Sequence, residues 1–248
     1  MEPRAEPRAG LREPLLAFAA AAVLVVLLAL MGGAVPFVRE NLQLFIAVVF
    51  LYMPAAAARV RGRRFDYREA GLRLDPIGLN LAVLGAAIAL TFPLFAAGFF
   101  GFYGWVCGPH GGPFAPFFGP LCQHWRGFGG GALRLPDRFA LSALNQLVVV
   151  AIPEEVFFRG YLMPALELRW PPRRRLLGAP VGAALLLSSA LFAVGHMLVV
   201  PNPQRLAVFF PALAFGWMRA RTGSIAPGAT YHALCNVVSD VLHTSYFG

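Results

Sequence analysis

Residues 147–163 read Leu-Val-Val-Val-Ala-Ile-Pro-Glu-Glu-Val-Phe-Phe-Arg-Gly-Tyr-Leu-Met, an apolar run interrupted by two adjacent glutamates and an arginine. An ionisable side chain in the middle of a bilayer costs about 2.5–3.5 kcal/mol or more, so such residues are rare and usually functional. Glu154, Glu155 and Arg159 are therefore the first candidates for a functional site, provided that the surrounding chain lies in a membrane.

The composition indicates a membrane protein. Of the 248 residues, 58% are hydrophobic and 13% are charged, whereas a soluble domain is about 25% charged. Three blocks contain no Asp, Glu, Lys or Arg, namely residues 14–38, 77–121 and 181–204. Each block is longer than the ~20 apolar residues that cross a bilayer, and none has the polar face of a soluble helix. The sequence predicts an all-α, polytopic transmembrane helical bundle.

The net charge of +9 comes entirely from arginine, because the chain contains no lysine. The arginines gather at the ends of the apolar blocks and are not interleaved with aromatic residues on one surface, so the pattern indicates no nucleic-acid partner. It follows the positive-inside rule, with four groups expected in the cytoplasm: Arg4/Arg8/Arg12, Arg59/Arg61/Arg63/Arg64/Arg68/Arg73, Arg169/Arg173/Arg174/Arg175 and Arg219/Arg221. All-arginine, alanine-rich usage suggests a high-GC bacterial genome, so we expect a plasma-membrane protein with a cytoplasmic N-terminus.

This placement predicts about seven spans, within a range of six to eight: 14–36, 42–58, 77–100, one within 138–168, 179–200, 205–219 and 224–244. The first block is interpreted as a retained span, because it is longer than the apolar region of a signal peptide. Three regions are expected: N-terminal spans with a basic cytoplasmic loop (1–76), the third span with an outer loop (77–136), and a catalytic helical core (137–248).

Two connections stand out. The basic connection at 59–76 is expected in the cytoplasm, with an amphipathic helix on anionic lipid as one option. The connection at 100–136 is rich in glycine, proline and aromatic residues, which favours a loop on the outer face. Cys107 and Cys122 both lie in this loop, where a disulfide and two free thiols are about equally compatible with the sequence.

Helical phase separates the two glutamates. Glu155 and Arg159 are four residues apart, so they can form an ion pair on one face. Glu154 is rotated from Glu155 by about 100° and can face a cavity. Pro153 removes a backbone donor just before them, which favours a kink where a site can open to water.

Other spans also carry polar groups. His196 lies on the fifth span, and His232, Asn236 and Asp240 form a stripe on the seventh. A carboxylate with a histidine can activate water, and a histidine with an asparagine amide can stabilise an oxyanion, which suits peptide hydrolysis. The alternative is a zinc site of Glu154, His196 and His232 with water as the fourth ligand, although no His-Glu-x-x-His motif supports it.

Three motifs resemble those of the CAAX prenyl protease and bacteriocin-processing family of intramembrane proteases (the CPBP or Abi family): Glu154-Glu155-x-x-x-Arg159, Phe192-x-x-x-His196 and His232-x-x-x-Asn236. The resemblance covers about residues 141–242. It implies that Glu154 and His196 activate water, and that His232 and Asn236 stabilise the oxyanion. Glu155 and Arg159 are then a structural ion pair. Some descriptions of the family class its members as metalloproteases, which would correspond to the zinc alternative.

The resemblance implies an endopeptidase that cuts near the C-terminus or membrane segment of a peptide or protein, which is lipidated or membrane-anchored. Bacterial relatives suggest peptide maturation or removal of sorting signals. Two other classes are weighed against it. A non-catalytic immunity or scaffold protein would bind a peptide and tolerate loss of the His/Asn stripe. A proton-coupled transporter would relay protons through Glu154 and Glu155, but it predicts inverted repeats, and the sequence contains no internal repeat.

Overall fold

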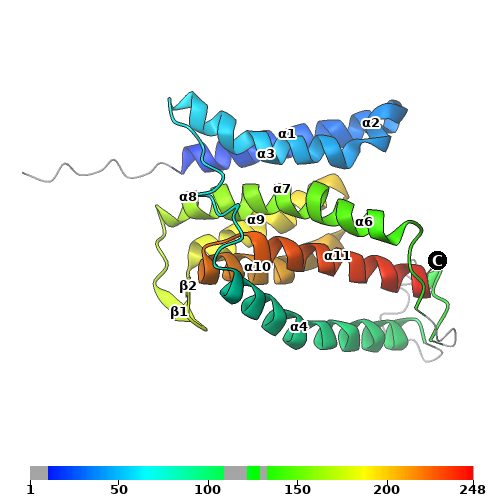
Figure 1. The fold of residues 1–248 in the computed structure, drawn as a ribbon. Helices are drawn as coiled ribbons and strands as arrows, with labels where there is room; N and C mark the ends of the chain where they lie inside the picture. The colour runs from blue at the N-terminus through cyan, green and yellow to red at the C-terminus, as the bar shows by residue number, and fades with distance from the viewer. Residues whose placement is uncertain (1–10, 109–121, 129–132, 248) are drawn as a thin grey trace, which may run out of the picture.

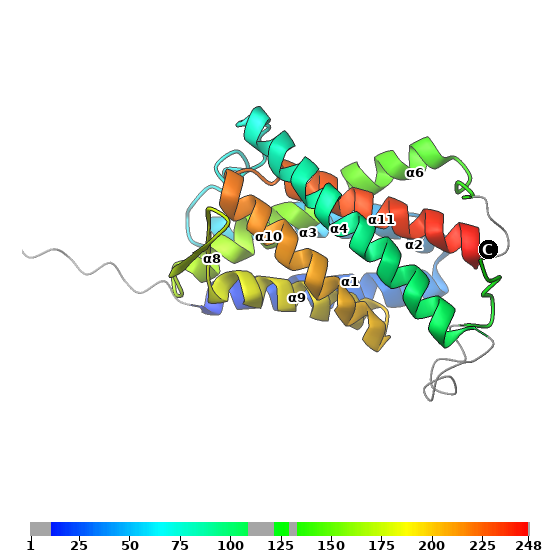
Figure 2. The same ribbon diagram turned by 90° about the horizontal axis from the view of Figure 1, so that it is seen from below.

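The computed structural model of the protein describes residues 11–108, 122–128 and 133–247. Its long helices lie roughly along one direction in stacked layers (Figure 1). In Figure 1 the N-terminal helices form one outer layer, α4 forms the opposite outer layer, and the helices that carry the motifs lie between them. In Figure 2, seen from below, α4 lies in front of the other helices. The predicted helical membrane bundle is confirmed.

The N-terminal layer is an antiparallel pair. α1 (Arg12–Ala34) packs along α3 (Leu42–Val60), and the short α2 (Pro36–Glu40) joins them. α1 also contacts α9, and α3 contacts the helix that carries the two glutamates. The pair therefore covers one side of the motif-bearing core, although it carries no motif itself.

The helix that carries the glutamates is continuous but irregular. Its five segments are α6 (Phe139–Asn145), η1 (Gln146–Ala151), α7 (Ile152–Glu155), η2 (Val156–Leu162) and α8 (Met163–Glu167). Both η segments are π-helical, a wide form of helix that is frequent at functional sites. Pro153 lies between them, where its missing N–H interrupts the regular hydrogen-bond ladder. The irregularity expected at Pro153 is thus a change of helical type.

A small β-hairpin follows, which the sequence analysis did not predict. β1 (Arg174–Leu176) pairs antiparallel with β2 (Ala179–Val181). The two turn residues, Leu177 and Gly178, have φ of 49° and 81°, as a two-residue hairpin turn requires. The fifth helix therefore begins after the hairpin and not at residue 179.

The remaining helices complete the bundle. They are α4 (Ile77–Val106), α9 (Ala183–Val199), the 3₁₀ segment η3 (Pro203–Val208), α10 (Phe209–Thr222) and α11 (Ala226–Tyr246). Each of the seven predicted spans thus corresponds to one helix or to the composite helix, but α4 extends to Val106, so residues 101–106 of the expected outer loop are helical. Within the described residues, α1, α3, α4 and the composite helix at 139–167 are each long and apolar enough to cross a membrane.

The outer faces of the bundle are apolar. Leu16 and Leu30 of α1 are 67% and 69% exposed, and Leu90 of α4 is 66% exposed. Large exposed apolar surfaces on a folded chain mark contact with a partner or a membrane. The buried core is aromatic and lies between the composite helix, α9 and α10, where the Phe158 and Phe192 rings meet edge to face with centroids 5.0 Å apart.

The basic connection after α3 contains no helix between residues 61 and 76, so the expected amphipathic helix is wrong. Its backbone is bonded to the start of α11 instead: Ile225 N donates to Gly71 O at 2.9 Å, and Ser224 Oγ donates to Arg73 O. Gly71 has φ of +100°, and a Cβ there would lie 2.7 Å from Arg219 Nε. A surface helix would lose these contacts.

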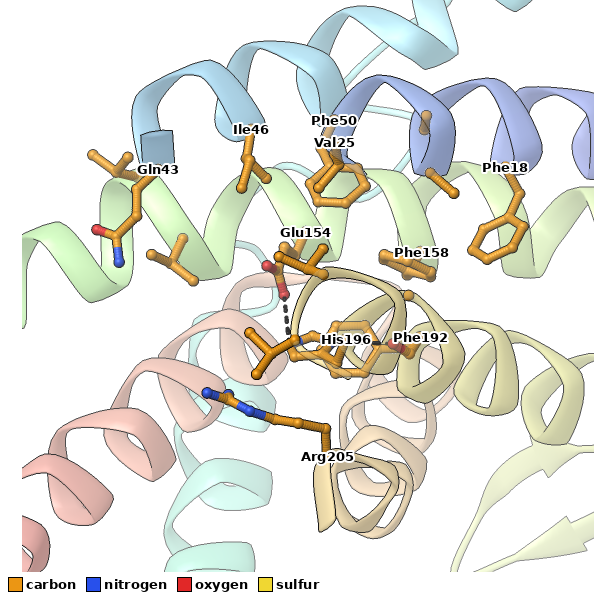
Figure 3. Close-up of a pocket in the computed structure, with 17 residues that line it drawn as sticks. Phe18, Val25, Gln43, Ile46, Phe50, Glu154, Phe158, Phe192, His196 and Arg205 are labelled. Carbon is orange, nitrogen blue, oxygen red and sulfur yellow. Dashed lines mark hydrogen bonds and ion pairs between the residues drawn. The ribbon is translucent and has the colours of Figure 1, made fainter. Parts of the chain in front are cut away.

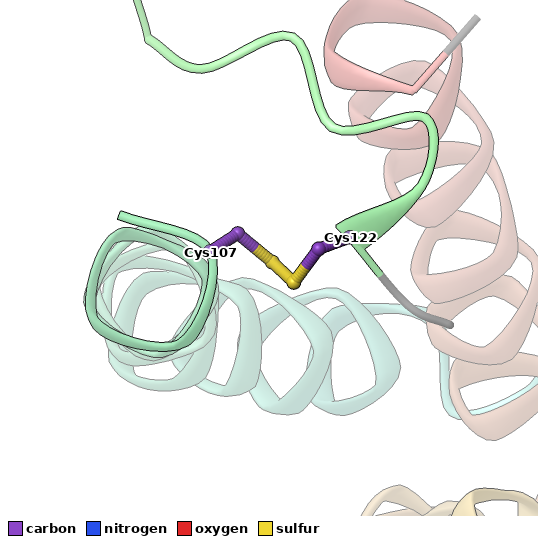
Figure 4. Close-up of a disulfide and its surroundings, with 2 residues drawn as sticks. All are labelled: Cys107 and Cys122. Atoms are coloured by element: carbon purple, nitrogen blue, oxygen red, sulfur yellow. A yellow bond between two sulfur atoms is a disulfide. The ribbon is translucent and has the colours of Figure 1, made fainter. Parts of the chain in front are cut away.

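Cys107 and Cys122 form a disulfide in the structure (Figure 4). It joins the end of α4 to residues 122–128, where Trp125 stacks on Tyr103 with centroids 5.2 Å apart. Arg126 N donates to Tyr246 O at 2.9 Å, so the same segment is bonded to the end of α11. The pairing left open by the sequence is resolved. The rest of the expected outer loop, at 109–121 and 129–132, lies outside the described residues.

Candidate active site

Glu155 and Arg159 form the expected ion pair in the interior of the core. Arg159 Nη1 donates to Glu155 Oε1 at 3.1 Å, and the side chains are 0% and 1% exposed. Arg159 Nη2 donates to Ala212 O of α10 at 3.1 Å. The guanidinium carbon lies 4.5 Å from the Phe192 ring centroid. The charge of Arg159 is therefore balanced by a carboxylate and packed against an aromatic face.

Glu155 has a second partner, which the sequence analysis did not identify. His232 Nδ1 lies 3.3 Å from Glu155 Oε1. The His232 ring stacks on Phe215 with centroids 4.7 Å apart and an angle of 13°. A carboxylate can only accept a hydrogen bond, so Nδ1 carries the proton of this bond. Glu155 therefore fixes the orientation of the His232 ring in addition to balancing Arg159.

Glu154 faces the other way and has different surroundings. Its Oε2 atom lies 3.8 Å from His232 Nε2 and 4.0 Å from His196 Nε2. These distances exceed those of a direct hydrogen bond, and Oε2 is buried without a hydrogen-bond partner among the described residues. Polar atoms at this separation are commonly bridged by water. The carboxylate and the two imidazoles thus define a position for a polar reactant.

The spacing of the second motif has a local explanation. His196 Nδ1 lies 3.0 Å from Phe192 O, one turn earlier on α9. A carbonyl accepts, so His196 Nδ1 must donate, and the lone pair of a neutral ring is left on Nε2. Both histidines therefore have Nδ1 engaged and Nε2 near Glu154. Figure 3 shows His196 facing Glu154.

A cavity of about 250 Å³ opens in front of Glu154. Its walls come from α1, α3, the composite helix, α9 and η3, and its polar lining residues are Gln43, Glu154, His196 and Arg205. Phe18 and Phe50, from the motif-free N-terminal pair, contribute apolar lining (Figure 3). The N-terminal helices thus form part of the wall of the candidate site, which the motifs alone did not indicate.

Asn236 lies apart from this cavity. Its Nδ2 donates to Gln146 Oε1 at 2.9 Å, and Gln146 Nε2 lies 3.5 Å from Asp240 Oδ2. Asn236 lines a second cavity of about 520 Å³ between α4, α10 and α11. Gln146 was missed by the sequence analysis. Its available signal was an amide in the apolar run, eight residues before Glu154.

The positions of the possible ligand atoms bear on the zinc alternative. Glu154, His196 and His232 are suitable ligands for zinc, and a second-shell acceptor on Nδ1 is usual for zinc-bound histidines. Within the described residues, however, no group of three or more His, Cys, Asp or Glu side chains is arranged so that it could hold a metal ion. The zinc alternative therefore stays a prediction.

Residues 136–238 match the family model described as "Rce1-like: Type II CAAX prenyl endopeptidase Rce1-like". The match contains all three motifs, and the family resemblance predicted from them is confirmed for this part of the chain. Residues before 136, including the N-terminal pair and α4, lie outside the match. The searches of curated proteins and of solved structures found no match. This part of the chain is therefore similar to a type II CAAX prenyl endopeptidase.

Proposed function

We propose that the protein hydrolyses a peptide bond within the membrane by means of a water molecule held between Glu154, His196 and His232. The observation that carries the proposal is the position of Glu154 Oε2. It is buried, it has no hydrogen-bond partner among the described residues, and it faces two Nε2 atoms beside an open cavity. A carboxylate that served only the fold would be expected to have a protein partner.

In the proposed reaction, Glu154 accepts a proton from water while the water oxygen bonds to the carbonyl carbon of the scissile peptide. His196 Nε2 accepts the second hydrogen bond of the water and orients it. The tetrahedral intermediate then breaks its C–N bond, and Glu154 returns the proton to the leaving amine. The products are a carboxylic acid and an amine, so atoms and charges balance.

The oxyanion of the intermediate requires hydrogen-bond donors. We assign this role to His232 and Asn236. His232 donates from Nε2 when the ring carries both protons, and the Glu155 carboxylate at Nδ1 stabilises that charge. Asn236 has a second amide hydrogen besides the one given to Gln146. Asn236 lines the second cavity and not the cavity of Glu154, so its part in the proposal rests on the motif and not on its present position.

We propose a plasma-membrane protein of a bacterium with a cytoplasmic N-terminus. The orientation is supported by one feature at each end of the helical bundle. Arg61 and Arg63 pair with Glu13 at one end, where the arginines near the hairpin also gather. The disulfide lies at the other end, because it joins the end of α4 to residues 122–128, which are bonded to Tyr246 near the C-terminus. Basic residues favour the cytoplasmic side, and disulfides persist on the oxidising side.

The proposed substrates are membrane-anchored or lipidated peptides and proteins, cut in a maturation or sorting step. The apolar walls of the cavity support an apolar substrate segment, because Phe18, Phe50 and Phe158 line it. The lateral position of α1 and α3 supports entry from the membrane rather than from water.

The test uses purified protein in lipid vesicles and a library of membrane-anchored peptides, with products identified by mass spectrometry. Glu154→Gln should abolish cleavage and leave the melting temperature unchanged, because the substitution keeps the shape of the side chain. Glu69→Gln is the matched control, since Glu69 is exposed in the connection between α3 and α4. Cleavage by Glu154→Gln at the wild-type rate would overturn the proposal.

A further inference from the structure

Arg205 is a charged lining residue of the cavity that the proposed reaction does not use. It lies on η3 (Pro203–Val208), directly after the charge-free block at 181–204. Its side chain lines the cavity of Glu154, on the far side of His196 in Figure 3. The residue itself is exposed, so the guanidinium is open to a ligand.

The other arginines near carboxylates show what Arg205 lacks. Arg159 is paired with Glu155 at 3.1 Å, and Arg61 lies 2.7 Å from Glu13. Arg205 forms no salt bridge with any carboxylate in the part of the chain that the structure describes. A cation without a counter-charge beside an apolar cavity favours an anionic group on the ligand, because opposite charges attract each other.

The cavity also limits the ligand. Its volume of about 250 Å³ is below the ~300–1,000 Å³ of sites for drug-sized ligands, so it has room only for a small group or a short segment of chain. Apart from Gln43, Glu154, His196 and Arg205, its lining is apolar. The cavity therefore suits a short apolar segment with a single negative charge at the end near Arg205. A peptide that ends in apolar residues has this form, since its α-carboxylate is its only charge.

We propose that Arg205 binds the free α-carboxylate of the substrate and so makes the protein specific for bonds close to a C-terminus. The inference rests on the proposed function and names a specificity-determining residue for it. The planar guanidinium of arginine matches a carboxylate through two parallel hydrogen bonds. The scissile carbonyl then lies toward Glu154 and His196, and the released product is the short C-terminal fragment.

The test measures binding, so that it does not depend on turnover. Fluorophore-labelled apolar peptides are prepared in pairs that differ only in a free C-terminal carboxylate or a carboxamide. Affinity is measured near neutral pH with Glu154→Gln protein in detergent, which prevents hydrolysis during the measurement. The free acids should bind about ten-fold more tightly, as expected for one charge-assisted hydrogen-bonded pair. Arg205→Gln in the same background should remove this difference.

Arg126→Gln is the matched control, because Arg126 is exposed and does not line the cavity. It should keep the ten-fold preference. Equal affinity for acid and amide, absence of binding by both, or a preference that survives Arg205→Gln would overturn the inference. Displacement of the acids by dodecyl phosphate but not by dodecanoate would also overturn it and would identify Arg205 as a phosphate site for lipid.

Failure of this inference and failure of the proposed function are distinguishable. If Glu154→Gln abolishes cleavage but acid and amide peptides bind equally, the protease proposal stands and Arg205 is not the anchor. If acids bind through Arg205 but wild-type protein cleaves no peptide, the site is a peptide receptor and the proposed function fails.

Discussion

Two adjacent glutamates on one helix lie in different surroundings. On one face, Glu155 is bonded to Arg159 and His232, and these groups are covered by Phe192 and Phe215. On the other face, Glu154 meets two imidazoles at distances too long for hydrogen bonds, beside a cavity. The comparison indicates that buried charge can serve the fold where it is held in an ion pair, and chemistry where a place is left for a reactant.

We expect the largest change in stability from a substitution of Arg159. Arg159→Met should lower the free energy of unfolding by about 3–5 kcal/mol, because Glu155 would remain buried with its charge uncompensated. The measurement is thermal unfolding in detergent. The double variant Glu155→Gln/Arg159→Met is the control and should regain part of the loss, since it removes both charges. A single variant as stable as wild type would contradict the paired role of this face.

Removal of the disulfide tests the contribution of a region that is remote from both glutamates. Replacing Cys107 and Cys122 together by serine should cost up to about 3 kcal/mol of stability, because a loop of about 15 residues is no longer closed in the unfolded chain. Cleavage per folded molecule should not change. A drop in the turnover number without a drop in melting temperature would instead connect the disulfide end to catalysis.

On the open face, His196→Gln should reduce the turnover number about 10²-fold, since general acid–base assistance is typically of this size or larger. Stability should change little, because His196 forms only one hydrogen bond to its own helix among the described residues. Kinetics on the vesicle-bound peptides provide the rate, and thermal unfolding provides the control. Wild-type turnover would exclude His196 from the reaction.

The smallest effect is expected at Gln146. Gln146→Leu should cost about 1 kcal/mol in stability, the usual contribution of one hydrogen bond, because Asn236 and Asp240 lose their amide partner. If Asn236 is an oxyanion donor, turnover should also fall, since its amide is no longer oriented. An unchanged turnover number would indicate that Asn236 acts without Gln146 or does not act.

The fold could be predicted where local rules apply. Charge-free blocks and arginine groups predicted the long helices, because burial in a bilayer constrains composition directly. The largest difference is at α4, which ends at Val106 and not at residue 100. The Glu155–Arg159 pair followed from their spacing of four residues. The hairpin at 174–181 and the irregular connection at 61–76 were not predicted, because both depend on tertiary contacts such as that between Gly71 and Arg219.

The candidate site was predictable only in part for the same reason. Its motifs named Glu154, His196 and His232, which converge, but they also named Asn236, which lines a different cavity. They did not indicate the bond between Glu155 and His232, which are 77 residues apart. The contribution of Phe18 and Phe50 to the cavity had no sequence signal, because α1 and α3 carry no motif and are placed by packing. Arg205 could have been noted as the charge that ends the apolar block at 181–204.

The division between the two glutamates is tested most directly by one paired measurement of Glu154→Gln and Glu155→Gln, with melting temperature and peptide cleavage recorded on the same preparations. Glu154→Gln should keep the wild-type melting temperature and lose cleavage. Glu155→Gln should melt roughly 10 °C lower, because Arg159 is left buried without its counter-charge. Equal losses of stability in both variants, or cleavage that survives in Glu154→Gln, would contradict the assignment.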